Sequence, residues 1–552
     1  MTSVVTAAGV SVTIRGPLVD ETESVLDRLV SDGVPGALLH GGGRLWGPDA
    51  APLAARRLGW LRLPGTSRDL LGPLAGRVRE ARAAGLTRVV LAGTGGAAAA
   101  AGTIVRSAAP EGTELVVLST SDPSAVRAAL SELAATLLVV VDKGGTTVET
   151  DAHLRVFEEA FREAGFDPAS RVLVVTDPGS PLDERLDERY AVVHADPETG
   201  GRFGALDAGG LVPSALAGAD PEELLDEASA LAATLDQPYE NPALALGAAL
   251  GASALAGRDK LVIADHGSGH PGLAAWIEQL VAASTGKDGR GLLPVVVEDV
   301  AAPGFTLTPD VRRVVLGARP DEPGPAREAG LTVSGPLGAQ FLLWEYAVAV
   351  AGRVIGVDPF DQPAVAESAD NTAALLRAAE GAAPTVIPSV PAFTDGSVEV
   401  HGREEFLKGL SSLPDVLDAL LSAVPDRGYL AVLAYLDPEG DASAAASRPL
   451  LAERGERLRR SPVPVTFGWG PRYLHSTGQY HKGGPENGAF LLVTGVADHD
   501  VPIPGRPYTM AELQLAQAFG DLRALRARSR PVVRVHLRNR ADGLARLAKA
   551  LA

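Results

Sequence analysis

The stretch that decides the fold is TLLVVVDKGGTTVETD, residues 136–151. An unbroken run of Leu and Val ends at an acidic residue, and two glycines and two threonines then lead into a helical pattern. Such a run is typical of a strand that is buried on both faces of a parallel sheet. Ligands of such sheets bind at the carboxyl ends of the strands, which places this turn where a ligand is expected.

The same succession of strand, polar turn and helix recurs along the chain, and it predicts an α/β protein with parallel-rich sheets. One set of strands comes before residue 200, and a second set begins after the Ala-rich helical stretch 222–256. The first set is predicted at 87–93, 114–120, 136–142, 171–177 and 190–196, and the second at 260–266, 292–299, 311–318, 429–437, 462–469 and 489–496. We therefore expect two α/β units of similar design, at 71–240 and 241–508, with an N-terminal segment at 1–70 and a helical tail at 509–552 that holds one strand.

Composition narrows the class of protein. The 552 residues include 50 basic and 68 acidic ones, and a net charge of −18 argues against non-specific binding to nucleic acid or to an anionic membrane. The chain has no cysteine, which excludes disulfides, thiol nucleophiles and cysteine metal sites. No apolar run approaches the ~20 residues of a membrane span, and no signal peptide is evident. We expect a soluble, cytoplasmic protein without a metal.

The first candidate ligand loop is LAGTGGAAAAAG, residues 91–102. Gly95 and Gly96 allow close approach to a ligand, and the following helix start offers free N–H groups. The spacing also matches the G-x-G-x-x-A pattern of dinucleotide sites, although no acid for a ribose ends the next strand. Three interpretations stay open: a sugar or phosphate loop, a dinucleotide site, or glycines that serve only strand–helix packing.

The second candidate is the loop of the opening stretch. Lys143 offers a charge, Thr146 and Thr147 offer hydroxyls, and the glycines expose amides at one helix start, which favours an anion site. Asp142 contradicts this pattern, because it puts a carboxylate where an anion would bind. Glu149 is interpreted as a capping glutamate.

Three further segments carry candidate residues. Arg202 follows two glycines and is either a clamp for a substrate charge or a structural ion pair. Glu278 lies in a helical pattern and faces either solvent or a cleft. The Gly-rich segment 473–488 gathers His475, Gln479, His481, Lys482 and Glu486, which suits acid–base chemistry or binding of sugar hydroxyls better than a metal, unless it is a polar surface loop.

Five segments in series resemble the glucose-6-phosphate isomerase family, and in particular its bacterial type that also occurs fused to transaldolase. They are KGGTTVETD (143–151), GGRFGALDAGGLVPSALAG (200–218), WIEQLVAASTGKDGRGLLPV (276–295), QFLLWEYAVAVAGRVIGVDPFDQPAVAES (340–368) and LHSTGQYHKGGPENGAFLLVTG (474–495). The resemblance implies two sugar-isomerase (SIS) domains, each an α/β/α sandwich, with the active site between them. It also implies a homodimer, no cofactor and no metal.

The reaction implied by this resemblance is the interconversion of glucose 6-phosphate and fructose 6-phosphate through a cis-enediol, a step of glycolysis and gluconeogenesis. His475, helped by Lys482, would open the sugar ring, and Arg202 would stabilise the developing negative charge. A glutamate would move the proton, with Glu278 and Glu486 as candidates. The substrate would be held by Gly95, Gly96, Lys143, Thr146, Thr147, Gln362 and Gln479.

The sequence departs from the family at five positions that belong to this site. Hydroxyl-bearing residues of the family are replaced by Ala97, Asp142 and Gly144, an acidic residue by Ala283, and a lysine by Ala369. Each hydrogen bond lost to a charged group is worth ~1.5–3 kcal/mol. The departures support an alternative hypothesis, a SIS protein that binds a sugar phosphate or a partner without isomerase activity.

Overall fold

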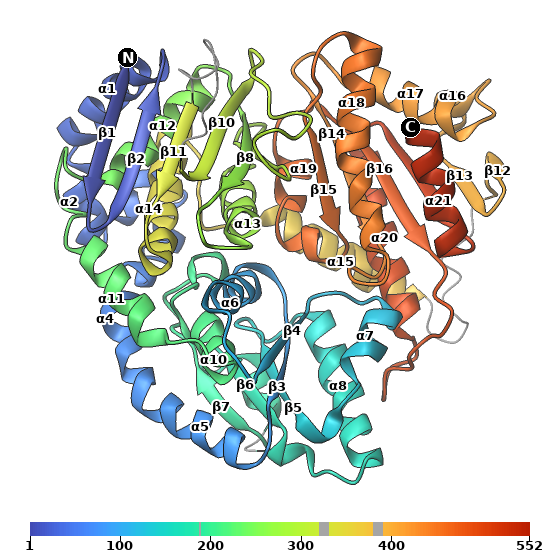
Figure 1. Ribbon diagram of the computed structural model, residues 1–552, viewed down its shortest axis with the longest axis horizontal. Coiled ribbons are helices and arrows are strands. Elements are labelled where there is room, and N and C mark those ends of the chain that lie inside the picture. Colours follow the sequence, from blue (N-terminus) through green and yellow to red (C-terminus); the bar gives the residue numbers. More distant parts are fainter. Residues whose placement is uncertain (187–188, 319–329, 379–389) are drawn as a thin grey trace.

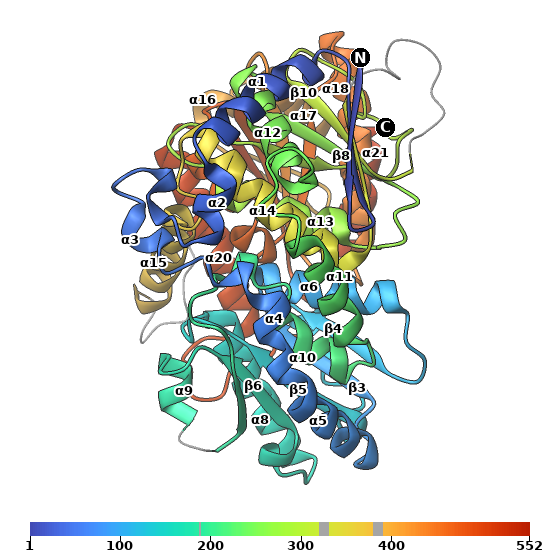
Figure 2. The ribbon, with the colours of Figure 1, turned by 90° about the vertical axis from the view of Figure 1, so that its left-hand side faces the viewer.

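The computed structural model describes residues 1–186, 189–318, 330–378 and 390–552, and its described strands form three sheets (Figure 1). In the view of Figure 1 one sheet lies below, in blue to cyan, and the other two lie side by side above it. Helices cover and separate the sheets, as Figure 2 shows from the side.

The lower sheet has five parallel strands in the order β4-β3-β5-β6-β7. Successive residues of its central strands pack into different cores, because side chains alternate between the two faces of a sheet. Helices α7 and α8 cover one face and α5, α6 and α10 the other, which gives an α/β/α sandwich. The strands are β3 (Arg88–Gly93), β4 (Glu114–Leu118), β5 (Thr136–Val141), β6 (Val172–Thr176) and β7 (Ala191–His194).

The second sheet has the order β1-β2-β11-β10-β8-β9 and packs against helices α12, α13 and α14. Its strands from β11 to β9 are parallel, whereas β1 and β2 form an antiparallel hairpin that pairs with β11. The strands are β1 (Thr2–Ala7), β2 (Val10–Arg15), β8 (Lys260–His266), β9 (Leu293–Val296), β10 (Val311–Gly317) and β11 (Gly330–Ser334).

The third sheet has the order β12-β13-β17-β16-β14-β15, with helices α17, α18 and α21 on its outer face. A core cluster of residues from β8, β10, β14 and β16 joins it to the second sheet. The strands are β12 (Phe393–Asp395), β13 (Val398–His401), β14 (Tyr429–Tyr435), β15 (Val465–Trp469), β16 (Gly488–Gly495) and β17 (Val532–Leu537).

The predicted fold class is confirmed, since the chain is α/β with parallel-rich sheets. The four-part division at 1–70, 71–240, 241–508 and 509–552 stays a prediction, and the pairing adds detail that the strand pattern did not contain. The first strands of the chain join the second sheet, β17 of the tail joins the third, and residues 241–508 contribute to two sheets.

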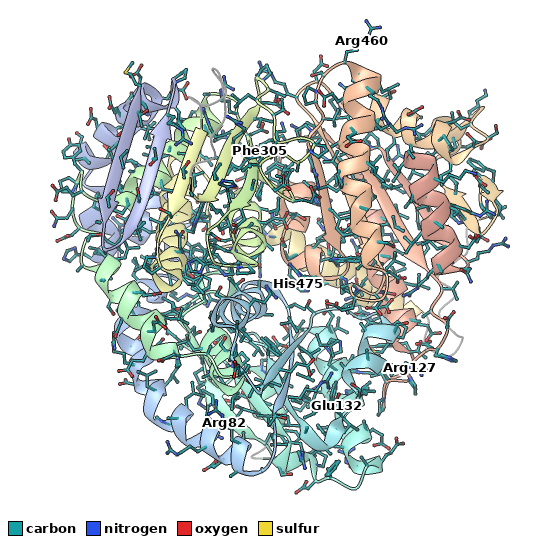
Figure 3. The ribbon with its side chains drawn as sticks, viewed as in Figure 1. Arg82, Arg127, Glu132, Phe305, Arg460 and His475 are labelled. Atoms are coloured by element: carbon teal, nitrogen blue, oxygen red, sulfur yellow. The ribbon has the colours of Figure 1, made fainter. Side chains whose placement is uncertain are left out.

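Helices from all parts of the chain converge at the centre of the molecule, where Figure 3 places His475. Helix α6 contacts α13, α13 contacts α19, and α15 contacts both α19 and α20. The helices are α1 (Leu18–Ser31), α2 (Val34–Leu39), α3 (Ala51–Ala54), α4 (Leu63–Thr66), α5 (Leu71–Ala83), α6 (Gly95–Ala108), α7 (Pro123–Ala129), α8 (Val148–Glu163), α9 (Pro181–Leu186), α10 (Ala208–Leu216), α11 (Pro221–Ala232), α12 (Pro242–Leu255), α13 (Leu273–Thr285), α14 (Leu337–Ile355), α15 (Pro363–Ala378), α16 (Glu404–Leu407), α17 (Leu413–Ser422), α18 (Ser447–Arg459), α19 (Gly478–Gly483), α20 (Met510–Ala527) and α21 (Arg540–Leu551). Among the described residues, none of these helices has both the length and the apolar character of a bilayer-crossing segment.

Candidate active site

A cavity of about 850 Å³ lies at the carboxyl end of β5. Its walls are the loop that leads from β5 into α8, the helix α15, and the short 3₁₀ helix η9 (Arg472–His475). The walls therefore come from segments far apart in the sequence, and they meet at the strand ends where the sequence predicts a ligand.

Asp142 fills the anion position of its own loop. Its carboxylate accepts hydrogen bonds from the amides of Gly145 and Thr147 at 2.9 and 2.8 Å. It also accepts from the hydroxyls of Thr147 and Thr150, at 3.0 and 2.9 Å. The positive end of the α8 dipole stabilises an anion at this place. The side chain that contradicted the phosphate-loop pattern is thus the anion that the loop binds.

Lys143 is directed away from the cavity. Its ammonium lies 2.7 Å from a carboxylate oxygen of Asp177 and 2.8 Å from one of Asp207, and it donates to the Asp196 carbonyl. Burial raises the pKa of Asp177, against the opposing charge of Lys143. Through these contacts Lys143 links the ends of β5, β6 and β7. Thr146, in contrast, lines the cavity.

His475 and Glu149 form a hydrogen-bonded pair in the cavity wall. The His475 Nε2 atom lies 3.1 Å from Oε1 of Glu149, whose side chain is 3% exposed against 24% for His475. Burial alone would raise the pKa of Glu149, but the hydrogen bond and charge of His475 outweigh it and hold the pKa below its usual value. A carboxylate must accept this bond, so Nε2 carries a proton and a neutral ring leaves Nδ1 as the basic nitrogen.

Glu149 is the site residue that the sequence did not reveal, since its position two residues after a helix cap favoured a capping role. Within the described residues no side-chain cap is formed at Thr147, and Glu149 bonds to His475, 326 positions away in the chain. No local pattern reports such a pairing.

Arg202 is buried behind the cavity and holds Gln362, which lines it. The guanidinium donates to Oε1 of Gln362 at 2.5 Å, to Ser284 at 3.3 Å, and to the carbonyls of Pro359 and Asp361. Burial lowers the pKa of Arg202 to about 10, so it stays charged at neutral pH. These four acceptors are all uncharged and Arg202 is outside the cavity lining, so these contacts show neither a clamp on a substrate charge nor an ion pair; Arg202 acts on the cavity by fixing Gln362.

Four candidates from the segment 473–488 do not line the cavity. His481 is buried, with its Nδ1 atom 2.8 Å from the Tyr429 hydroxyl. Lys482 is buried, with its ammonium 2.5 Å from Asp521 and 2.9 Å from the Ser368 hydroxyl. Gln479 is buried and bonds to the backbone of Ala364 and Gly286. Glu486 is exposed on the surface. The sequence brought these residues near His475 along the chain, but the turns of η9 and α19 point them elsewhere.

Glu278 lies on α13 close to Arg472, which belongs to the same 3₁₀ helix as His475. Burial raises the pKa of Glu278 to about 7, and the charge of Arg472 opposes this rise. Burial also lowers the pKa of Arg472. Glu278 is outside the lining of the 850 Å³ cavity. It is therefore a carboxyl group with a pKa near neutral pH that lies beside the site rather than in its wall.

The first glycine loop lies against the same residues. Gly95 has φ +71°, and a Cβ there would be 3.9 Å from the Cβ of His475. A Cβ on Gly96 would come within 2.7 Å of the Gly201 carbonyl oxygen and 2.8 Å of the Arg202 Cα. Gly96 therefore serves close packing against the Arg202 segment, one of the three interpretations left open by the sequence.

The remaining departures from the family pattern fall in different places. Gly144 and Ala369 line the cavity. The cavity therefore lacks the hydroxyl and the ammonium group that the family pattern has at these two positions. Ala97 and Ala283 are buried, with exposed fractions of 5% and 0%. A longer polar side chain at Ala283 would have to displace its neighbours, because the site around it is closely packed.

Comparison with known proteins gives relatives over much of the chain, although the chain matches no family model. It is 32% identical over 378 residues to the glucose-6-phosphate isomerase of Rubrobacter xylanophilus, a match that covers 56% of this chain and 86% of that protein. It is 38% identical over 213 residues to a probable glucose-6-phosphate isomerase of Haloarcula marismortui, covering 37% of this chain and 48% of that protein. The second match thus spans about half of the relative's length.

Solved structures share the fold. A glucose-6-phosphate isomerase from Chlamydia trachomatis superposes with a TM-score of 0.55 at 20% identity, covering 68% of this chain and 90% of that one. At this identity the likeness concerns the fold alone.

Proposed function

This chain belongs to the glucose-6-phosphate isomerase family, and from that premise we propose that it interconverts glucose 6-phosphate and fructose 6-phosphate through a cis-enediol intermediate. The observation that carries the proposal is the His475–Glu149 pair in the cavity wall. An aldose–ketose isomerisation moves protons between oxygen and carbon atoms of one substrate, and a histidine oriented by a buried carboxylate supplies the acid–base group it needs.

Ring opening is the step that we propose for His475. With Nε2 held by Glu149, Nδ1 accepts the proton of the anomeric hydroxyl, and the imidazolium then returns it to the ring oxygen as the C–O bond breaks. The Glu149 carboxylate stabilises the imidazolium in between, which lowers the barrier in the same way as the acid of a catalytic triad. Gln362, fixed by Arg202, supplies an amide for a sugar hydroxyl.

Proton transfer between C2 and C1 needs a second acid–base group. Glu278 is the candidate carried over from the sequence, and its raised pKa of about 7 suits a general base near neutral pH, but it lies beside the cavity lining rather than in it. Lys482 is assigned no contact with substrate, because its ammonium is enclosed by Asp521 and Ser368. The homodimer that the resemblance implies and the cytoplasmic location that the sequence predicts stay predictions.

A coupled assay that consumes glucose 6-phosphate formed from fructose 6-phosphate tests the proposal. We expect turnover by the purified chain, and a fall in kcat of about 10²-fold or more in Glu149→Gln, because the amide no longer fixes the imidazole or stabilises its charged form. Glu159→Gln on the same helix is the matched control, since Glu159 pairs with Arg162 at the surface. Phosphosugar binding without turnover would instead support a SIS protein that binds but does not isomerise.

A further inference from the structure

The loop that resembles a phosphate site already holds an anion. Its two amides and two hydroxyls donate to the Asp142 carboxylate, and Lys143 is paired elsewhere. A phosphoryl dianion placed in this loop would meet a carboxylate at close range and find its donors taken. Like charges this close repel each other strongly where the protein excludes water. The phosphate of a sugar substrate therefore needs another holder in the same cavity.

Arginines gather in the cavity wall next to this loop. Arg185, Arg377 and Arg506 all line it, and they come from α9, α15 and the segment before α20. The loop and α9 are adjacent, because a Cβ on Gly145 would be 2.6 Å from the Leu182 amide, one turn before Arg185. We name Arg185, Arg377 and Arg506 the rim arginines.

One carboxylate cannot neutralise the cations around it. Asp151 lies 2.6 Å from Nη2 of Arg506 and 2.9 Å from Nε of Arg155, and it also bonds to Arg185. Three guanidiniums therefore share this one carboxylate, and two of them, Arg185 and Arg506, line the cavity. Arg377 of α15 lines the same cavity, as does Asp370. The other carboxylates of the lining have partners of their own, since Asp142 accepts from its loop and Glu149 from His475. Each guanidinium has five N–H donors in a planar fork, so most of them stay available for a second anion.

We propose that the phosphoryl group of the substrate binds to the rim arginines rather than inside the loop 142–150. Arginine forks match the oxygens of a phosphate and bind them in pairs. The cavity is long enough to reach both ends of such a substrate, since His475 and the rim arginines line one continuous space of about 850 Å³. In this arrangement Thr146 and Gly144 contact the uncharged part of the sugar. The inference rests on the proposed function only for the identity of the sugar that carries the phosphate.

Titration calorimetry with inorganic phosphate, and separately with fructose 6-phosphate, tests the inference on the intact chain. We expect Arg506→Gln and Arg377→Gln each to weaken binding of both probes about 10- to 100-fold, the loss of a charge-assisted hydrogen bond. Arg155→Gln is the matched control, because Arg155 also pairs with Asp151 but does not line the cavity, and we expect a change of less than about 3-fold. Thr146→Val, which removes a loop hydroxyl, is expected to leave phosphate binding within about 2-fold.

Three outcomes would overturn the inference: no binding of either probe by the parent chain, equal binding by the arginine variants and the parent, or a loss of inorganic phosphate binding in Thr146→Val as large as in Arg506→Gln. Arg377 is exposed, so we expect Arg377→Gln to fold normally, and a loss of binding in this variant cannot be attributed to misfolding. Steady-state kinetics separate the two proposals. Phosphate binding that depends on the arginines, without turnover, would support the site at the rim arginines and contradict the isomerase activity. Turnover that is unchanged in Arg377→Gln and Arg506→Gln would support the isomerase activity and contradict the site at the rim arginines.

Discussion

At the scale of single residues, Asp142 determines what the loop after β5 can bind. Its carboxylate is 7% exposed and accepts four hydrogen bonds from three residues of the loop and of α8. A side chain that satisfies the donors of a helix start orders the loop without a ligand. The same contacts make the loop unable to hold a second anion while Asp142 is ionised.

Asp142→Ala should therefore lower stability and create a phosphate site. We expect the free energy of unfolding to fall by about 3 kcal/mol. This is the value of one strong hydrogen bond to a charged group, because water from the cavity can satisfy the other donors that Asp142 leaves. Added inorganic phosphate should then raise the Tm of the variant more than that of the parent chain.

The matched control for this prediction is Asp183→Ala at the start of α9, where Asp183 accepts from the Gly179 amide at 2.9 Å in a more open position. Its Tm should not respond to phosphate beyond the parent's response. If phosphate does not raise the Tm of Asp142→Ala more than that of the parent, the donors of the loop do not form an anion site once the Asp142 carboxylate is removed.

Glu278 gives the chain a pH-dependent stability term. Its pKa rises from 4.5 in the unfolded chain to about 7 in the folded one through burial. The folded state thus prefers the protonated carboxyl, and this contribution is full below about pH 4.5 and lost as pH rises through 7. Glu278→Gln removes the loss. The free energy of unfolding of the variant should therefore gain on that of the parent between pH 5 and pH 8, by at most about 3 kcal/mol, and its Tm should rise relative to the parent's.

Thermal melts at pH 5, 6, 7 and 8 measure this difference, with Glu486→Gln as the control on the exposed side. Parallel curves for Glu278→Gln and the parent would contradict a raised pKa. Measuring kcat/KM of the parent at the same pH values tests Glu278 as the candidate base. If its carboxylate must be ionised to take a proton, kcat/KM falls as the pH drops below about 7.

At the scale of elements, the position of α15 depends on a buried cation. Lys482 of α19 lies 2.5 Å from Asp521 of α20 and 2.9 Å from Ser368 of α15, and both carboxylate and ammonium are almost fully buried. Ser368 and Ala369 are neighbours in the cavity wall. A buried ion pair that is fully hydrogen-bonded fixes the register of the helices it joins.

Lys482→Met should cost 3–5 kcal/mol, roughly the effect of leaving a carboxylate buried without its partner. Chemical denaturation measures it, and adding Asp521→Asn to the variant should restore part of the loss. Arg528→Met is the comparison, because Arg528 ties α20 to Glu367 of α15 through a partly exposed pair whose loss costs about 1 kcal/mol or less. Equal effects in the two variants would refute the buried anchor.

At the scale of the whole molecule, the first and third sheets are tied by one guanidinium. Arg540 at the start of α21 lies 2.6 Å from Asp122, which caps α7, and 2.9 Å from Asp441. Asp122 has an exposed side-chain fraction of 0% and also accepts from Gln514 of α20 at 3.2 Å. Residues 122, 441, 514 and 540 thus couple parts of the chain that have separate cores.

Arg540→Met should lower the free energy of unfolding by about 3–5 kcal/mol and broaden the calorimetric transition, because the lower sheet loses its link to α21. Arg546→Met on the same helix is the control, since Arg546 forms exposed pairs with Asp542 and Asp395. A narrow transition at an unchanged temperature in Arg540→Met would show that the two parts are held together by apolar contacts alone.

The sequence by itself determined the elements and the family. Runs such as 136–141 and 171–177 indicated buried parallel strands, because apolar burial leaves its mark on every residue of a strand. The loop after β5 was predicted as a ligand position for the same local reason. His475 and Gln362, carried over from the family motif, lie in the wall of one cavity.

Only the tertiary structure decided how the strands divide into sheets and which charges meet. The strand at 10–15 pairs with β11 and the strand at 532–537 pairs with β16, since hydrogen bonds between strands depend on the path of the chain and not on local pattern. Glu149 reaches His475, and Lys482 turns toward Asp521, across hundreds or tens of positions. A charged side chain takes the partner that folding brings near it, because burial makes an unpaired charge costly, and no local signal encodes that choice.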